Sequence, residues 1–292
     1  MENISVSSVP VLRKCLLDIS EPIAKRTHAA FFLRTLGSEE AVQVILEGTV
    51  RNDSSLLRHE LGYILGQLQN PVACSTLIDI LSDETEDVLV RHESAEALGA
   101  IGHDSALDVL GKLCDHSYPE VSETCQIARD LILWRAAGRQ DDSGDTRLYQ
   151  SVDPAPPFPV HAHSVSELSQ ILTSAEIPLF DRYRAMFSLR NLNSDAAALA
   201  LVQGLNDSSA LFRHEIAYVL GQMQRPCAID GLESVLKNLS EHRMVRHEAA
   251  ESIGAIGGEV AENVLKSYAL DGEVVVQQSC EVALDTMDYW NS

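Results

Sequence analysis

The chain has 292 residues, with 43 acidic against 22 basic side chains and a formal net charge of −21 at pH 7. Such a surface disfavours nucleic acid and anionic membranes as partners and suits cationic ligands such as amines or lysine-rich loops, although solubility alone explains the bulk of the charge equally well. No segment has the roughly 18 to 20 apolar residues that span a bilayer, and the N-terminus lacks the pattern of a secretory signal. Six scattered cysteines without a C-x-x-C motif favour a reduced, cytoplasmic protein.

An internal duplication organises the chain. In the first half, four units of about 30 to 33 residues follow one another, and each returns about 155 positions later. The clearest matches are RHELGYILGQLQNP (58–71) with RHEIAYVLGQMQRP (213–226), and VRHESAEALGAIG (90–102) with VRHEAAESIGAIG (245–257). Repeats of this length predict a solenoid in which neighbouring units bury a shared core.

Each unit is predicted to be helical. In the unit around residues 90–102, Val90, Leu98 and Ile101 mark one apolar side, while Glu93 and Glu96 occupy another. The pattern V-R-x-x-A-A-x-A-L-G-x-I-G resembles HEAT-type repeats, which are pairs of antiparallel helices. We therefore expect an all-α fold, an α-α superhelix of eight HEAT-like helical hairpins in two duplicated lobes.

Helix ends and lobe boundaries are also predicted. Asp53 and Asp207 stand where N-caps are expected, and Gly102 and Gly257 where C-caps are expected. Residues 138–164 are rich in Asp and contain a cluster of prolines, through which no helix continues. We expect lobes at 1–137 and 165–292, four repeats each, joined by a linker at 138–164 that lies on the surface.

Four His-Glu dipeptides are the candidate functional residues. They lie in the two inner units of each half: His59 and Glu60, His92 and Glu93, His214 and Glu215, His247 and Glu248. Surface decoration inherited by duplication would not be confined to the inner units. Imidazole and carboxylate are ligands for iron, manganese or zinc, and two His with one Glu form the set used by non-haem iron oxygenases. Because stacked helices lie about 8–10 Å apart, the two His of one half can share an ion, which predicts two ions.

Small residues follow every one of these histidines. A Gly or Ala lies three positions after each His and a Gly seven positions after it, on the same helix face. The stripes comprise Gly62 and Gly66, Ala95 and Gly99, Ala217 and Gly221, and Ala250 and Gly254. Close helix packing is the favoured explanation, ahead of a role in lining a cavity.

The combined pattern resembles the deoxyhypusine hydroxylase family. The residues that carry the resemblance are the four His-Glu pairs and the segments SVDPAPP (151–157), LFDRYRAMFSLRN (179–191), LFRHEIAYVLGQMQ (211–224) and SCEVALD (279–285). The resemblance implies a monooxygenase with two iron ions and no organic cofactor, whose ferrous form reacts with O2. We expect the protein to be a monomer in the cytoplasm. Its substrate would be the deoxyhypusine side chain of translation initiation factor 5A, which becomes hypusine.

The same resemblance implies that all eight His and Glu residues of the four pairs are the metal ligands. If each iron takes two His and one Glu, one Glu in each half is free to hold the cationic substrate amine, and Glu93 and Glu248 are our candidates. Two alternatives are an inert solenoid that acts as a protein scaffold, and a structural or hydrolytic zinc site. The first expects varied residues at the His-Glu positions, and the second expects a colourless protein.

Overall fold

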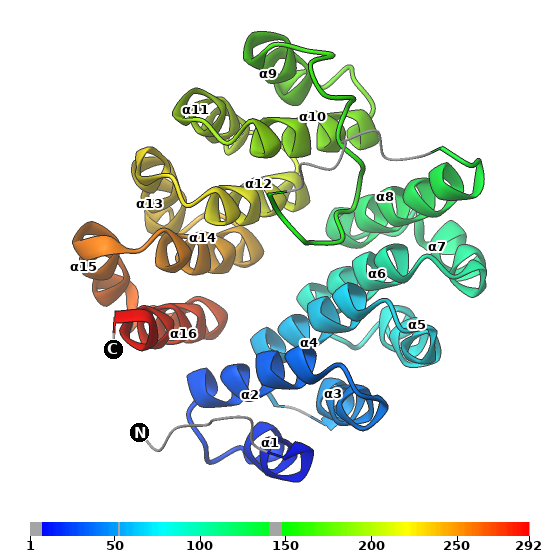
Figure 1. Ribbon diagram of the computed structural model, residues 1–292, viewed down its shortest axis with the longest axis vertical. Coiled ribbons are helices and arrows are strands. Elements are labelled where there is room, and N and C mark those ends of the chain that lie inside the picture. The colour runs from blue at the N-terminus through cyan, green and yellow to red at the C-terminus, as the bar shows by residue number, and fades with distance from the viewer. Residues whose placement is uncertain (1–7, 52, 140–147, 292) are drawn as a thin grey trace. The chain divides into compact units, whose positions relative to one another are not determined.

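The computed structural model describes residues 8–51, 53–139 and 148–291, and all the regular structure in these ranges is helical. The chain divides into two compact units, Met1–Ala128 (unit 1) and Arg129–Ser292 (unit 2). Sixteen α-helices in the described ranges form eight consecutive antiparallel pairs (Figure 1). This is the α-α superhelix of HEAT-like repeats that the sequence predicts. No described helix is long and apolar enough to cross a lipid bilayer.

The helices of unit 1 are α1 (Val9–Leu17), α2 (Ile23–Leu36), α3 (Glu39–Arg51), α4 (Ser55–Leu68), α5 (Cys74–Ser82), α6 (Val88–Ile101) and α7 (Leu107–Leu113), with α8 (Pro119–Ala136) crossing into unit 2. Unit 2 continues with α9 (Val165–Thr173), α10 (Leu179–Leu192), α11 (Asp195–Gly204), α12 (Ala210–Met223), α13 (Ile229–Lys237), α14 (Arg243–Ile256), α15 (Gly258–Tyr268) and α16 (Val274–Asn291). Short 3-10 turns at Pro71–Ala73, Asp104–Ala106 and Pro226–Ala228 precede α5, α7 and α13.

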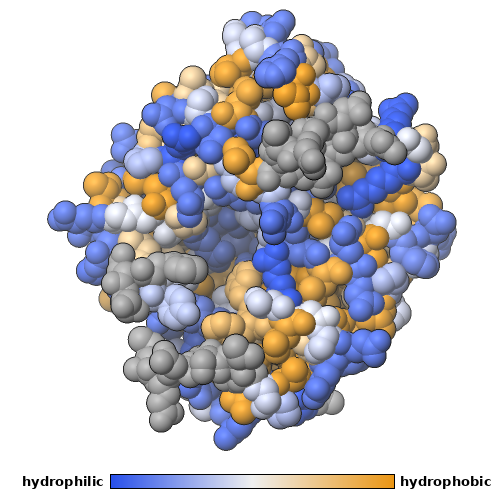
Figure 2. All heavy atoms as spheres, viewed as in Figure 1, coloured by the Kyte–Doolittle hydropathy of each residue, from blue (hydrophilic) through white to orange (hydrophobic). Residues whose placement is uncertain are grey.

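Within each unit the second helices of successive pairs stack on one another, α4 on α6 and α12 on α14. The core between the layers is aliphatic, and Leu57, Leu61, Leu98, Ile216 and Leu220 are fully buried. The face of the molecule in Figure 2 carries many hydrophilic residues with hydrophobic ones between them, as expected for a chain of this charge. The stacked helices α4, α6, α12 and α14 carry the four His-Glu pairs.

The helix caps agree with the sequence at the C-terminal ends and differ at the N-terminal ends. Gly102 and Gly257 follow α6 and α14 with φ of 73°, as predicted. The N-caps of α4 and α12 are Ser54 and Ser209, whose side chains accept from Leu57 N and Phe212 N, so the prediction of Asp53 and Asp207 is wrong. Asp207 instead pairs with Arg182 and accepts from Ser209 N.

The proline-rich segment is packed against the helices of unit 2 rather than lying on the surface. Residues 154–157 are buried. Arg190 of α10 donates to both Asp153 carboxylate oxygens, at 2.8 and 2.5 Å, and Phe158 N donates to Ser188 Oγ at 2.8 Å. The expected surface position is therefore wrong for residues 154–157, because a partly buried ion pair and a hydrogen bond from the backbone of Phe158 hold the flanking residues to α10.

A repeated arginine links successive repeats. In four repeats, an arginine near the start of the second helix donates its Nε–H to the carbonyl oxygen ten residues earlier, at 2.9–3.1 Å. The bond satisfies a carbonyl in the last turn of the preceding helix. These arginines are Arg26, Arg91, Arg182 and Arg246. Three of the four then pair with an Asp of the next repeat: Asp53, Asp207 and Asp271. The fourth, Arg91, faces His116 instead, with Nη2 3.3 Å from Nε2.

His116 is an incomplete partner for Arg91. Its Nδ1 accepts from Tyr118 N at 3.1 Å, while its Nε2 faces the guanidinium, yet a neutral imidazole accepts at one nitrogen only. Arg91 is fully buried, and its Nη1 has no hydrogen-bond partner in the described part of the chain. Asp271, at the equivalent position, accepts from both Arg246 and Glu273 N.

We therefore expect His116→Asp to raise the free energy of unfolding by roughly 1–3 kcal/mol, because two carboxylate oxygens satisfy both donors and supply the missing charge. Urea denaturation of the metal-free protein measures the change. The reciprocal variant, Asp271→His, should lower the stability. A His116→Asp protein that unfolds at the same or a lower urea concentration would show that Arg91 needs no carboxylate.

Candidate metal centre

In unit 1, neighbouring helices bring two His-Glu pairs together below the surface. His59 and Glu60 lie on α4, and His92 and Glu93 lie on α6, each His being the fifth residue of a 14-residue helix. The side chains are buried, with 4% exposure for His59, none for His92, 8% for Glu60 and 3% for Glu93. Because the two His occupy the same position in two stacked helices, their side chains lie at the same level along the helix axes.

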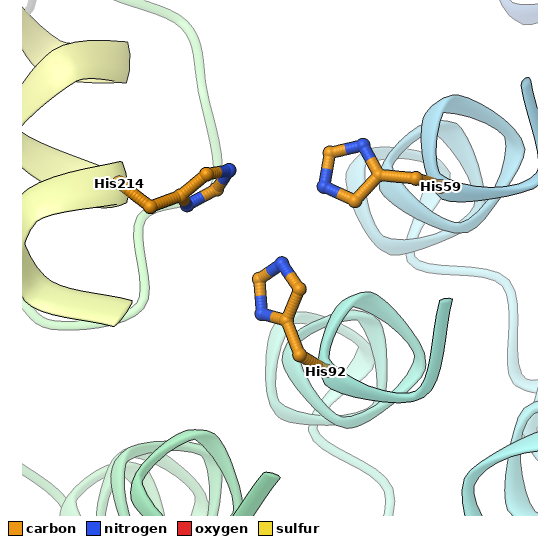
Figure 3. A group of neighbouring side chains, drawn as sticks. All are labelled: His59, His92 and His214. Carbon is orange, nitrogen blue, oxygen red and sulfur yellow. The ribbon is translucent and has the colours of Figure 1, made fainter. Parts of the chain in front are cut away.

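The two imidazoles of unit 1 converge on one carboxylate. Glu93 Oε2 lies 3.1 Å from His59 Nε2 and 3.6 Å from His92 Nε2. The ring centroids of His59 and His92 are 5.5 Å apart, and Figure 3 shows both rings entering the same space from α4 and α6. Glu60 lies on the other side of His59, with Oε1 3.2 Å from Nδ1.

Unit 2 repeats this arrangement. His214, also labelled in Figure 3, projects from α12, and His247 projects from α14 with a ring-centroid separation of 5.4 Å. Glu248 Oε2 lies 3.5 Å from His214 Nε2, and one ligand atom from each of His214, His247 and Glu248 falls within 4.8 Å of the others. Glu215 is buried on α12 but does not belong to this group.

The charges of unit 1 act on the protonation of His59. Burial lowers its pKa, but the negative charge of Glu93 and the hydrogen bonds with Glu60 and Glu93 outweigh burial and raise the pKa well above the ordinary value of 6.5. The acids therefore favour a positive charge beside them. A metal cation bound here would supply that charge in place of the proton, since metal-ligating imidazole must be neutral.

The donor set fits a divalent transition metal. Two imidazole nitrogens and one carboxylate oxygen are the ligands of a two-histidine, one-carboxylate site, which leaves open positions on iron. In each unit, the three donors are buried and come from two stacked helices. Within the described residues, a second possible group in unit 1 consists of His92, Glu93 and Glu96, but Glu96 is only half-buried.

Two further acids, one beside the candidate donors of each unit, were not predicted from the sequence. Glu96 and Glu251 lie four residues after His92 and His247, one helical turn along the same face. Glu251 Oε1 is 3.7 Å from His247 Nδ1. The sequence could have indicated both acids, because the spacing H-E-x-x-E occurs at these two His-Glu pairs. The other two histidines are followed at the same spacing by Tyr63 and Tyr218.

The small-residue stripes are packing contacts, as the sequence favoured. A Cβ on Gly66 would lie 2.9 Å from Ala97 Cα, and one on Gly99 would lie 2.8 Å from Ala128 Cα. In unit 2, a Cβ on Gly221 would lie 2.4 Å from Ser252 Oγ. The glycines thus permit the close approach of stacked helices that brings the histidines of one unit together.

Comparison with known proteins agrees with this geometry. A family model described as HEAT repeats matches residues 46–128 and 198–285, and one described as PBS lyase HEAT-like repeat matches 181–207. The deoxyhypusine hydroxylase of Danio rerio is 48% identical over 95% of this chain and 90% of its own length, and that of Drosophila melanogaster is 45% identical over 99% and 94%. The chain belongs to the deoxyhypusine hydroxylase family.

The structure is also similar to that of a deoxyhypusine hydroxylase over nearly all of the chain. A structure of human deoxyhypusine hydroxylase in complex with glycerol has a TM-score of 0.91, with 43% identity and coverage of 97% of both chains. The protein is therefore an enzyme of the hydroxylase type, built from HEAT repeats. The four His-Glu pairs that the sequence singled out lie on the stacked helices of this shared fold.

Proposed function

We propose that this protein hydroxylates the deoxyhypusine side chain of translation initiation factor 5A, in a reaction that consumes O2 and uses two iron ions. His59, His92 and Glu93 would hold one iron, and His214, His247 and Glu248 the other. The observation that carries the proposal is the convergence of two imidazoles and one carboxylate in each unit, in a chain 43–48% identical to named deoxyhypusine hydroxylases.

Hydroxylation of an unactivated C–H bond needs an oxidant stronger than any side chain, and ferrous iron held by these residues would supply that oxidizing power from O2. The protein's residues provide neutral imidazole lone pairs and carboxylate charge, and they hold these groups on rigid helices. Burial of all eight His and Glu side chains limits the access of water to the centre. Exclusion of water protects reactive species from side reactions and strengthens electrostatic interactions with the substrate.

The geometry leads us to assign the acids in the opposite way to the sequence-based candidates. Glu93 and Glu248 are the carboxylates closest to imidazole Nε2 atoms, so we propose them as ligands. Glu60 and Glu215 are then available to accept hydrogen bonds from the cationic amines of the substrate, which are strong when one partner is charged. Glu60 also faces His59 Nδ1 and so orients that ring.

Glutamine substitutions separate these assignments. Glu93→Gln should remove about one iron per chain, because an amide gives a neutral and weaker donor in place of the carboxylate. Glu60→Gln should keep both irons and weaken substrate binding by roughly 10-fold or more, the loss expected for one charge-assisted hydrogen bond of about 1.5–3 kcal/mol. Iron analysis and substrate titration measure the two effects. If Glu93→Gln retains two irons and loses substrate affinity, the sequence-based assignment stands.

The decisive experiment combines metal analysis with an activity assay. Purified protein loaded anaerobically with ferrous iron is mixed with factor 5A carrying deoxyhypusine and then exposed to O2. Mass spectrometry should show one added oxygen on the modified lysine. Two irons per chain without hydroxylation would reject the substrate, and a zinc-loaded, colourless protein inert to ferrous iron would reject the oxygenase.

The proposal includes a monomer acting in the cytoplasm. All six cysteines lie in the described part of the chain and are free thiols, three of them buried in helices, which suits a reducing compartment. Burial raises the pKa of Cys125 and of Cys280 to about 12, so both stay protonated and inert. The acidic surface favours a basic protein substrate over nucleic acid or membrane.

A further inference from the structure

The last of the four repeats in each half of the chain lacks a His-Glu pair. It places a buried hydroxyl against the neighbouring helix that carries a His-Glu pair, α6 or α14. In unit 1 the hydroxyl belongs to Thr124 of α8, which is 3% exposed, and in unit 2 to Ser279 of α16, which is fully buried. The two residues are separated by the 155 positions of the internal duplication. Both hydroxyls therefore occupy the same place in the repeat.

The hydroxyl of Thr124 lies against Nδ1 of His92. Its Oγ1 donates its single hydrogen to the carbonyl oxygen of Glu120 at 2.6 Å. Toward His92 Nδ1, 3.4 Å away, it therefore presents only lone pairs and accepts. A neutral His92 must then carry hydrogen on Nδ1 and a lone pair on Nε2, the nitrogen that faces Glu93.

In unit 2, Ser279 contacts a carboxylate that lies beside His247. Its Oγ donates to Glu251 Oε1 at 2.8 Å, and that oxygen lies 3.7 Å from His247 Nδ1. A negatively charged oxygen beside Nδ1 favours hydrogen on that nitrogen, which leaves the lone pair on Nε2. The hydroxyl holds the carboxylate in place, since a half-buried Glu side chain otherwise has several rotamers.

We infer that Thr124, and Ser279 acting through Glu251, are positioning residues that fix the Nε2-donor tautomer of His92 and His247. The inference rests on the proposed function, in which these two imidazoles bind metal. Partners of this kind fix the ring orientation of metal-binding histidines, and their loss typically costs 10- to 100-fold in metal affinity. The same repeat position performs the task in both units, directly in one and through an acid in the other.

Two variants and one conservative control test the inference. Thr124→Val keeps the shape and removes the hydroxyl, Ser279→Ala removes one oxygen, and Thr124→Ser keeps the hydroxyl. Long-range proton–nitrogen NMR spectra of the metal-free protein report the tautomer of each histidine. We expect hydrogen on Nδ1 of His92 in the wild type and in Thr124→Ser, and a mixture of tautomers in Thr124→Val.

Anaerobic titration with ferrous iron against a competing chelator provides the second readout. Each single variant should bind one of its two irons 10- to 100-fold more weakly and the other normally, with Thr124→Ser equal to the wild type. Wild-type tautomers and iron affinities in both variants would overturn the inference, as would a Thr124→Ser protein that behaves like Thr124→Val. A wild type that binds no iron would reject the proposed function, while the tautomers would still decide this inference.

Discussion

Substitution of His247 by Ala is expected to remove one of the two irons and to lower turnover by more than about 100-fold. Loss of a residue that only hydrogen-bonds to a metal ligand costs up to about 100-fold, and we propose His247 as a ligand itself. His247 is fully buried and contributes one of three donors in unit 2, alongside His214 and Glu248. Its removal leaves two donors, too few to hold the ion in competition with water. The iron of unit 1 should remain, since His59, His92 and Glu93 lie on α4 and α6.

Metal content per chain, measured after anaerobic loading and removal of free iron, checks this prediction together with the hydroxylation assay. His103→Ala is the matched control, because His103 is an exposed residue that caps the short turn before α7. The control should keep both irons and wild-type turnover. If His247→Ala binds two irons with unchanged affinity, His247 is not a ligand and the two-histidine, one-carboxylate assignment of unit 2 fails.

The duplication made the fold and the helices of the site predictable from the sequence. Two copies of each repeat showed which features recur, and the His-Glu pairs stood out because they occur only in the inner units. The stripes that end in Gly66 and in Gly99 also predicted close packing, the favoured explanation for small residues along one helix face. These are local, periodic features of the sequence, and they can be recognised without knowledge of tertiary contacts.

The features that the sequence did not reveal depend on contacts between distant residues or on backbone geometry. Both Asp53 and Ser54 are good N-cap residues, and only the backbone shows that Ser54 is the cap. The burial of the proline-rich segment depends on the pairing of Arg190 with Asp153, 37 residues apart. Thr124 is an ordinary helical residue in the sequence, and its role follows only from its distance to His92.

The roles that we propose for the acids differ from the sequence-based candidates for the same reason. Adjacent residues on a helix point about 100° apart, so the sequence does not show whether His92 and Glu93 of one pair reach the same space, although in the structure Glu93 Oε2 lies 3.6 Å from His92 Nε2. The same carboxylate oxygen also reaches across to His59 on the neighbouring helix, where it lies 3.1 Å from Nε2. The candidate donors of each unit therefore come from two neighbouring repeats, and the spacing between the stacked helices determines whether they meet.

This dependence on helix spacing leads to the second large expected effect. Gly66→Ala should lower the free energy of unfolding by roughly 1–3 kcal/mol, the usual cost of overpacking. A Cβ at Gly66 would lie 2.9 Å from Ala97 Cα and 3.2 Å from Ala97 Cβ, so α4 and α6 must move apart. That movement also separates His59 from His92 and Glu93, and we expect the iron of unit 1 to bind at least several-fold more weakly, while the iron of unit 2 is unaffected.

Gly111→Ala is the control, because Gly111 lies in α7 and nothing is within 4 Å of a Cβ placed there. Removing a helical glycine without a clash should stabilise the protein by about 0.5–1 kcal/mol. Urea denaturation of the metal-free variants and chelator competition with ferrous iron give the two quantities. A Gly66→Ala protein as stable as the wild type would show that the helices can separate at no cost. Lost stability with unchanged iron affinity would instead show that the metal centre adjusts to the wider spacing, so that the glycine stripe serves the fold alone.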